Sequence, residues 1–231
     1  MCAEQVRKLI VAIDGPAGAG KSTVAKRLAK ELGYAYMDTG AMYRAFAWKV
    51  MKEGIDPSDE KKLERVLQDT SIELLEQDGR SSVLLNGVDV TDRIRTPELS
   101  QLASRVSTSK IVRERMVELQ RDMGSHGGVV AEGRDIGTVV FPNAEVKVFL
   151  DASSEERARR RFEELRSQGR EVTVEETLEE MEQRDRRDRE RDVAPLRKAE
   201  DAVVIDSTQA GVDGVVGRIM QEIKRKQSAI Q

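Results

Sequence analysis

A glycine-rich loop near the start of the chain has the residue types and the spacing that bind phosphate. Gly15 is followed, after four intervening residues, by Gly20, Lys21 and Ser22. Glycines let backbone N–H groups turn toward an anion, and the N-terminus of a following helix points the same way. Lys21 can lie between phosphates, and the Ser22 hydroxyl can ligate Mg²⁺. The pattern predicts a nucleoside triphosphate site made of Gly15, Pro16, Ala17, Gly18, Ala19, Gly20, Lys21, Ser22 and Thr23.

The sequence on either side of this loop predicts the elements that such a site requires. The apolar run 9–14 is rich in β-branched residues and predicts a strand. Val24, Leu28 and Leu32 recur every four residues, which predicts a helix that stops at Gly33. A chance match of a glycine-rich turn is disfavoured because both the strand and the helix are in place.

Two more groups of polar residues follow predicted strands. The strands are at 34–37 and 129–131, and the groups are Asp38, Thr39 and Arg44, and Glu132, Arg134 and Asp135. Ligands of open α/β sheets bind at the carboxyl ends of strands, so we expect both groups near the phosphate loop. An arginine and two acids in a glycine-bracketed loop are costly to bury without partners, which favours a site. From its position alone, Arg44 is equally well explained as a solvated helix residue.

The stretch 155–191 contains eleven arginines, thirteen acids and no lysine. Ion pairs between helix turns explain the acids and most of the arginines. The exclusive use of arginine, however, favours forked recognition of phosphate. Arg184, Asp188 and Arg191 are spaced by four and three residues, so they share one helix face, and Gly169 offers a flexible tip between two helices.

The remaining patterns predict an α/β fold. Strands at 146–151 and 202–206 complete a five-stranded parallel sheet flanked by helices, and 71–90 predicts three short antiparallel strands with turns at Asp78-Gly79 and Asn86-Gly87. Helices are expected after Thr96, before Gly124 and over 212–223. We therefore predict a P-loop kinase fold with a core at 1–55 and 108–231, a helical lid at about 155–191, and an inserted antiparallel β/α lobe at 56–107 that binds the acceptor nucleoside monophosphate.

Composition excludes several classes of protein. Lys and Arg number 39 against 42 Asp and Glu, and aromatic residues make up 3%, which disfavours binding to a nucleic-acid polymer. The single Cys2 allows no internal disulfide, and no apolar run approaches the length of a membrane span or a signal peptide. We expect a cytoplasmic monomer, and we predict no role for His126.

The motifs together resemble the bacterial cytidylate kinases of the nucleoside monophosphate kinase group, nearly from end to end. The resemblance is carried by residues 13–23, 38–44, 103–106, 133–140 and 184–189. It implies ATP-dependent phosphorylation of CMP and dCMP with Mg²⁺. One departure is Glu132, where we expect an aspartate.

The resemblance also implies roles for individual residues. Ser104, Arg113 and Asp135 would face the cytosine, where a carboxylate can accept the N4 amino proton. Arg184 and Asp188 would hold the sugar hydroxyls, and the acceptor phosphate would be held by Arg44, Arg134 and Arg191. Arg157 and Arg161 are candidates to close over the transferring phosphoryl group, and residues 206–208 would neighbour the adenine.

Two alternatives remain at this point. One is a kinase of another small acceptor on the same scaffold. The other is an arginine-rich interaction module gated by nucleotide, which turnover with a small acceptor would eliminate. A switch GTPase is disfavoured because no Asn-Lys-x-Asp motif is present.

Overall fold

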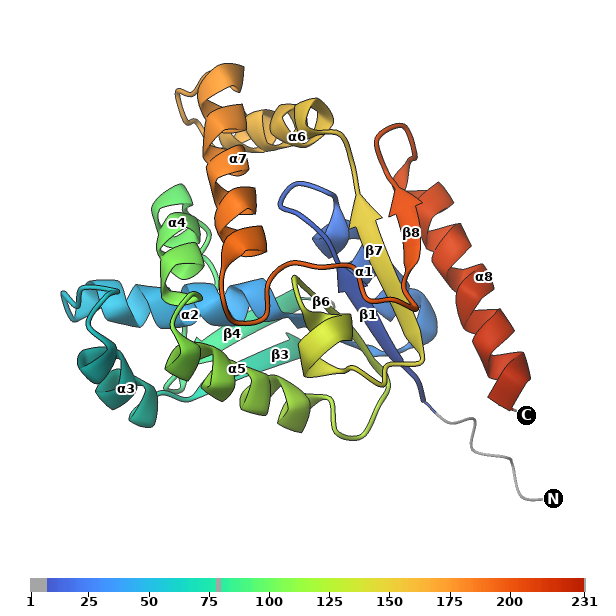
Figure 1. The fold of residues 1–231 in the computed structure, drawn as a ribbon, viewed down its shortest axis with the longest axis horizontal. Coiled ribbons are helices and arrows are strands. Elements are labelled where there is room, and N and C mark those ends of the chain that lie inside the picture. Colours follow the sequence, from blue (N-terminus) through green and yellow to red (C-terminus); the bar gives the residue numbers. More distant parts are fainter. Residues whose placement is uncertain (1–7, 78–79, 231) are drawn as a thin grey trace.

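The computed structural model describes residues 8–77 and 80–230, and its centre is a five-stranded parallel sheet (Figure 1). The predicted N-terminal features, including Cys2, and the turn at Asp78-Gly79 lie outside the described residues. The strand order is β2-β6-β1-β7-β8. All neighbours pair in parallel, as predicted. The strands are β1 (Ile10–Asp14), β2 (Ala35–Asp38), β6 (Val129–Gly133), β7 (Val146–Asp151) and β8 (Val203–Asp206).

Helices cover both faces of this sheet, so its central strand is apolar on both sides. Val11 and Ile13 of β1 pack in one cluster with helices α1 (Lys21–Leu32) and α8 (Val212–Ile230). Ala12 points the other way, into a cluster with α5 (Lys110–Met123) and the short π-helical turn η1 (Ile136–Val140). The loop expected after β6 therefore continues into a helical turn.

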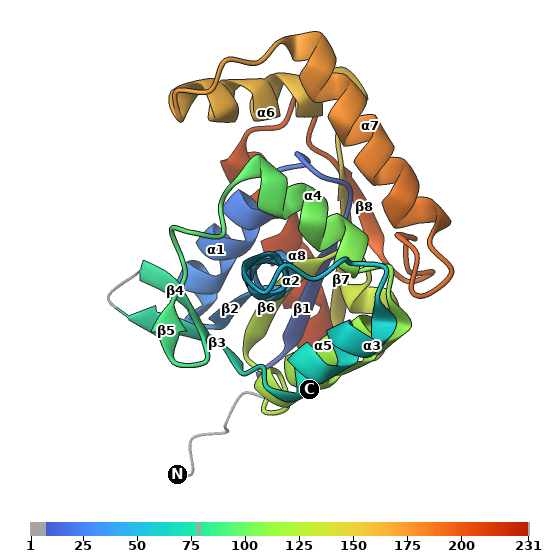
Figure 2. The same cartoon turned by 90° about the vertical axis from the view of Figure 1, so that its left-hand side faces the viewer.

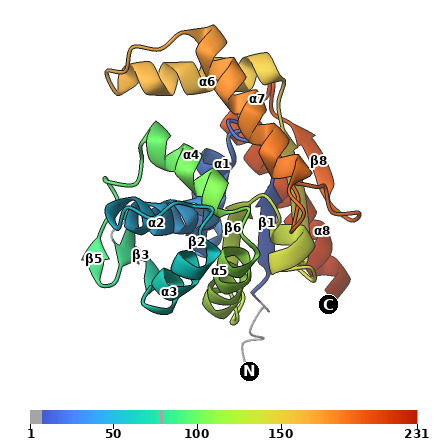
Figure 3. The same cartoon turned by 60° about the vertical axis from the view of Figure 1, so that its left-hand side comes forward.

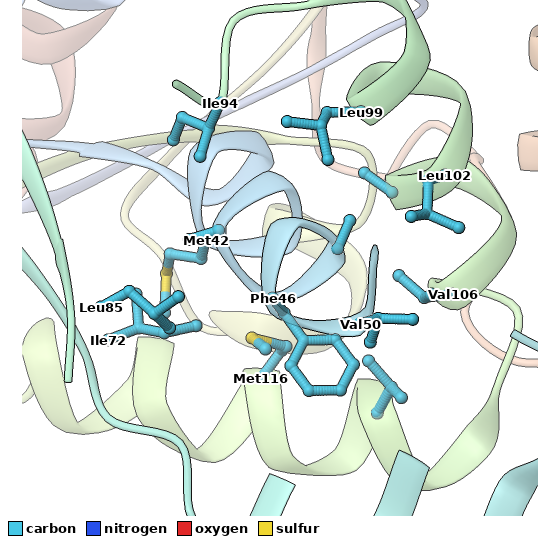
Figure 4. Close-up of a cluster of buried hydrophobic side chains, with 14 of the residues drawn as sticks. Met42, Phe46, Val50, Ile72, Leu85, Ile94, Leu99, Leu102, Val106 and Met116 are labelled. Atoms are coloured by element: carbon cyan, nitrogen blue, oxygen red, sulfur yellow. The ribbon is translucent and has the colours of Figure 1, made fainter. Parts of the chain in front are cut away.

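The segment between β2 and α5 builds a third hydrophobic cluster around Phe46 and Met42 of α2 (Thr39–Lys52) (Figure 4). Its antiparallel sheet has the predicted three strands, β3 (Ile72–Gln77), β4 (Arg80–Leu85) and β5 (Val88–Asp89). Helix α4 (Pro97–Val106) begins at its predicted cap, because the Thr96 side chain accepts a hydrogen bond from the N–H of Leu99. The cluster also includes residues of α5, so this segment shares its core with α2 and α5.

The sequence analysis did not predict α3 (Glu60–Gln68). Its signals were present: Asp59 caps the helix through the N–H of Lys62, and the buried Leu63, Val66 and Leu67 follow helical spacing.

The arginine-rich stretch forms the predicted helical pair, α6 (Ser154–Ser167) and α7 (Val174–Glu190), which stands beyond the carboxyl ends of the strands (Figure 1). Gly169 lies between them with a positive φ of 75°. Seen from the side, α7 runs beside α4, and the two helices are in contact (Figure 2). Within the described residues, no helix is long and apolar enough to cross a membrane.

Candidate functional site

A cavity of about 620 Å³ opens at the carboxyl ends of the parallel strands, below α6 and α7. Figure 3 shows α6 and α7 above α4 and the sheet, and the cavity is lined by residues from each of these parts. Most of the predicted site residues line it: Ala17, Gly18, Gly20, Lys21, Ser22, Thr23, Asp38, Thr39, Arg44, Ser104, Arg113, Arg134, Asp135, Arg161, Arg184, Asp188 and Arg191. Gly15, Pro16, Ala19 and Arg157 do not. The structure thus brings residues from five separate segments into one volume.

The phosphate loop, residues 15–20, has the backbone that its glycines permit. Gly15, Gly18 and Gly20 have φ values of 151°, 75° and 88°. These values lie in a region that side chains disfavour. A Cβ on Gly15 would also lie 1.9 Å from the carbonyl oxygen of Leu150. Glycine at this position therefore allows β1 and β7 to remain paired as the chain turns into the loop.

Lys21 is buried at the base of the loop, and its Nζ donates to the carbonyl oxygen of Pro16 at 2.6 Å. Burial, together with the charge of Arg134, lowers its pKa to about 7. Glu132, at the end of β6, is buried nearby and accepts a hydrogen bond of 2.5 Å from the Tyr36 hydroxyl. Burial and the charge of Asp38 raise the Glu132 pKa. Ser22, a neighbour of Glu132, lines the cavity as well.

Several buried arginine nitrogen atoms in residues that line the cavity have no hydrogen-bond partner within the described part of the chain. They include Nε of Arg44, Nε of Arg184 and Nη2 of Arg191. Burial and the charge of Arg134 lower the pKa of Arg184 to about 10. Buried polar groups normally have partners, and cations crowded together repel one another, so this part of the cavity is suited to an anion with several oxygen atoms.

Two carboxylates hold the arginines in place. Asp38 caps α2 and accepts from Arg44 at 3.1 Å, and Asp188 accepts from Nε of Arg134 at 2.8 Å. Burial raises the Asp188 pKa, but the surrounding arginines outweigh it and bring the pKa below its ordinary value. Asp188 is therefore ionised, but its single negative charge is outnumbered by the positive charges of the arginines that line the cavity.

Asp135 forms a buried ion pair with Arg113, and the guanidinium of Arg191 lies 3.8 Å from its other oxygen. Ser104 lies beside this pair on α4, where its hydroxyl accepts from Nε of Arg187 at 3.3 Å. Arg187 also donates to Gln101 at 2.5 Å. The sequence analysis placed Asp135 in a candidate site from its loop after a strand, but it found Ser104 and Arg113, and the cytosine role of all three, only through resemblance. It gave no role to Arg187 or Gln101.

The two lid arginines proposed for the phosphoryl group have different environments. Arg161 lines the cavity and pairs with Glu164 at 2.7 Å. Arg157 is only 4% exposed and lies outside the cavity lining. Its guanidinium is occupied by Asp185 and by the carbonyl oxygens of Ala17 and Ala152, and a direct contact between Arg157 and the transferring phosphoryl group stays a prediction.

Arg160, which the sequence analysis did not single out, lines the cavity instead. Its guanidinium donates to the carbonyl oxygen of Ser207 at 2.6 Å. The Ser207 hydroxyl in turn donates to Ala19 at 3.0 Å. The segment expected near the adenine is therefore joined both to the lid and to the phosphate loop.

A phosphate loop on a parallel sheet, opposite an arginine-lined cavity and beneath a helical pair, defines a P-loop kinase. Solved structures support this fold. The chain matches the shikimate kinase from Acinetobacter baumannii with a TM-score of 0.50 and 17% identity, covering 95% of each chain. It matches a gluconokinase from Sinorhizobium meliloti with a TM-score of 0.50 and 15% identity, covering 98% of this chain and 97% of that one.

Sequence comparison gives the family. The family model for cytidylate kinase matches residues 11–225. The cytidylate kinase of Caldicellulosiruptor bescii is 51% identical over 94% of this chain and 96% of its own length. That of Bacillus subtilis is 50% identical over 95% of this chain and 98% of its own. The chain belongs to the cytidylate kinase family.

Proposed function

We propose that the protein transfers the γ-phosphoryl group of ATP to CMP and dCMP, giving ADP and the pyrimidine diphosphate. The observation that carries the proposal is that one cavity holds both a phosphate loop and a separate group of buried arginine nitrogens that have no hydrogen-bond partner among the described residues. Two anion sites in one volume suit a donor and an acceptor that are both phosphorylated. Membership of the cytidylate kinase family supports cytosine as the base of the acceptor.

On the donor side, we assign the triphosphate to residues 15–23. The assignment is supported by the positive φ values of the loop glycines and by Lys21 at its base. Arg161 and Arg160, both at the cavity, are suited to contact the triphosphate and the adenine end respectively. The hydrogen bond from Arg160 to Ser207 supports an adenine site beside residues 206–208.

On the acceptor side, we assign the phosphate to Arg44, Arg134 and Arg191, and the sugar hydroxyls to Arg184 and Asp188. Asp135, Arg113 and Ser104 are assigned to the cytosine. A carboxylate accepts the N4 amino proton of cytosine, whereas the same position in uracil is an oxygen that the carboxylate would repel. We propose residues 56–107 as the acceptor-binding lobe, because Ser104 lies on α4 and approaches the cavity from this segment.

The chemistry requires positioning and charge neutralisation. The acceptor phosphate is already ionised, so no general base is needed. The arginines place the attacking oxygen in line with the bond that breaks, and Lys21 neutralises charge on the oxygens that pass from donor to acceptor. The lid helices exclude water, which would otherwise accept the phosphoryl group.

Mg²⁺ is proposed as the metal that accompanies ATP. Among the described residues, no group of three or more His, Cys, Asp or Glu side chains forms a metal site by itself. The Ser22 hydroxyl with the nearby Glu132 carboxylate offers the few oxygen ligands that Mg²⁺ uses when phosphates and water supply the rest. When bound, the ion would neutralise part of the negative charge on the donor phosphates.

We further propose that the enzyme works as a cytoplasmic monomer. The large exposed apolar side chains of the described residues are distributed over separate elements: Met51, Leu75, Val88, Met123, Val174, Val203, Val204 and Val212. This scatter is ordinary for a monomer's surface.

The first experiment measures ADP release from ATP and Mg²⁺ with CMP, dCMP, UMP, AMP, GMP and shikimate as acceptors. Turnover with CMP and dCMP well above all the others is the expected result. Preference for another acceptor would leave a P-loop kinase but remove the cytosine assignment. No turnover with any acceptor would favour the nucleotide-gated interaction module.

A folded Lys21→Met variant is the matched control for this assay. The variant lacks the Lys21 ammonium group, which neutralises charge on the oxygens of the transferring phosphoryl group. Its kcat should therefore fall by at least about 100-fold, the scale of one preorganised charge contact. Circular dichroism and urea unfolding check that the variant is folded. Near-normal turnover by that variant would contradict the assignment of the phosphate loop.

A further inference from the structure

The lid helices meet the phosphate loop at a buried ion pair that lies outside the cavity lining. Arg157 of α6 and Asp185 of α7 are 4% and 2% exposed, and Nη1 of Arg157 lies 2.6 Å from Oδ2 of Asp185. The two residues are separated by 28 positions in sequence. Neither side chain lines the cavity that we assign to the donor and the acceptor.

This pair binds the backbone of the phosphate loop from two directions. Nη1 of Arg157 donates to the carbonyl oxygen of Ala17 at 3.1 Å. Oδ1 of Asp185 accepts from the N–H of Ala17 at 3.4 Å. Both backbone polar groups of one loop residue are therefore held by side chains from the two lid helices.

Packing around the next residue seats the loop further between the helices. A Cβ on Gly18 would lie 2.7 Å from Cε of Met181 on α7, and 3.0 Å from the carbonyl oxygen of Arg157 on α6. There is no room for a side chain at this point. The tip of the loop is thus enclosed by α6 on one side and α7 on the other.

All three guanidinium nitrogen atoms of Arg157 donate hydrogen bonds. Besides Asp185 and Ala17, it donates from Nε to the carbonyl oxygen of Ala152 at 3.1 Å and from Nη2 to Ser154 Oγ at 3.2 Å. Lysine has one nitrogen and cannot make contacts in these separate directions. Burying an ion pair gives little net stability compared with an apolar pair of similar volume. Its directional hydrogen bonds to the loop are therefore the property that an apolar pair would not reproduce.

We propose that Arg157 and Asp185 are positioning residues that hold Ala17 and Gly18 in the shape that binds the triphosphate, and so couple seating of the lid helices to ATP binding. The proposal rests on the proposed function for the identity of the donor. The pair acts through the loop backbone, so its loss should weaken ATP binding while leaving the acceptor site, which it does not contact, nearly unchanged.

The test replaces both charges at once, in Arg157→Met/Asp185→Leu, which leaves no single buried charge without its partner. Losing the two hydrogen bonds to Ala17, each a modest contribution, should weaken ATP binding about 10-fold. The KM for CMP should stay within about twofold, below the scale of one lost hydrogen bond. ATP binding is measured by calorimetry without acceptor, KM values by ADP release, and folding by urea unfolding.

The matched control is Arg159→Met/Glu163→Leu, which removes an exposed pair from α6, with side chains 54% and 59% exposed. It should leave ATP binding unchanged. Should the buried double variant fail to fold, Arg157→Lys takes its place, since lysine keeps the charge beside Asp185 but loses the forked contacts. The same selective weakening of ATP binding is expected.

Wild-type ATP affinity in the folded buried variant, an equal rise in the KM for CMP, or an equal loss in the exposed control would overturn the proposal. If the wild-type protein does not phosphorylate CMP, the proposed function is wrong, but the role of the Arg157–Asp185 pair is not yet decided. ATP calorimetry on the same variants still decides whether the pair positions the loop.

Discussion

At the scale of single residues, Asp14 shows how a buried carboxylate can join two sites without touching either ligand. It ends β1 directly before the phosphate loop and is 4% exposed. Its oxygens accept from the N–H groups of Ile136 and Gly137, each at 2.8 Å. These residues follow Asp135, which we assign to the cytosine. Asp14 therefore fixes the backbone of the acceptor loop relative to the donor loop.

The protonation of Asp14 predicts a pH dependence of stability. Burial raises the pKa of Asp14 to about 6, and the charge of Asp135 adds to this rise. The two backbone hydrogen bonds and the charge of Lys21 act in the opposite direction but do not outweigh burial. In the unfolded chain it ionises near its ordinary value of 3.8. Between these values the folded protein keeps a proton that the unfolded chain has lost. This contribution to stability is therefore present in acid and declines as pH rises from about 4 to about 6.

Asp14→Asn removes this titration and supplies the comparison. The unfolding free energy of wild type, taken relative to the variant, should fall by about 3 kcal/mol across that range and stay constant above it. Urea unfolding at a series of pH values measures the difference. Parallel pH profiles for the two proteins would contradict a raised pKa at Asp14.

At the scale of an element, α7 begins with a complete capping box. The Thr173 side chain accepts from the N–H of Glu176 at 3.1 Å, and the Glu176 carboxylate accepts from the N–H of Thr173 at 2.9 Å. Helix α7 carries Arg184 and Asp188 toward the cavity near its other end. The cap contributes to helix stability at a distance from the site, so its effects on stability and on substrate binding can be separated.

Thr173→Ala should lower the unfolding free energy by about 1 kcal/mol, since the N–H of Glu176 loses its partner at the helix start. Thr173→Ser keeps a hydroxyl that can cap and should recover most of the loss. Urea unfolding of the two variants beside wild type gives the comparison. An alanine variant as stable as wild type would show that the cap is satisfied by water.

At the scale of the whole molecule, the lid reaches α4 through two contacts of different character. Arg187 of α7 is partly buried and donates to Gln101 at 2.5 Å and to Ser104 at 3.3 Å. Arg170, between the lid helices, pairs with Glu98 at 3.0 Å, and both side chains are exposed. Only the first contact borders the cavity residues assigned to the acceptor.

Arg187→Met should raise the KM for CMP about 5-fold, because two hydrogen bonds that bring α7 to α4 are lost beside the proposed cytosine site. Arg170→Ala is the control and should change the KM for CMP by less than about twofold, as expected for an exposed ion pair. Steady-state assays at saturating ATP distinguish the two. An equal change in the KM for CMP in both variants would contradict the prediction, because it would mean that the Arg187 contact has no special effect on the proposed cytosine site.

The sequence predicted much of the fold because its signals are local. Short continuous apolar runs located all five parallel strands, and Gly20-Lys21-Ser22 located the phosphate loop. The π-helical turn at Ile136–Val140 escaped prediction because its backbone is held by Asp14, more than a hundred residues away. Helix α3 was not predicted, although its signal is also local: Asp59 is a capping residue, and Leu63, Val66 and Leu67 follow it at helical spacing.

By itself, the sequence determined the class of fold, the phosphate loop and the arginine character of the lid, because spacing of residue types within a segment decides each of these. Tertiary structure alone decided which arginines have free nitrogen atoms. Arg161 and Arg184 reach the cavity, whereas Arg157 is buried against Asp185 and the loop backbone. The chemistry of a guanidinium depends on what surrounds it, and for these residues the surroundings come from segments distant in the chain.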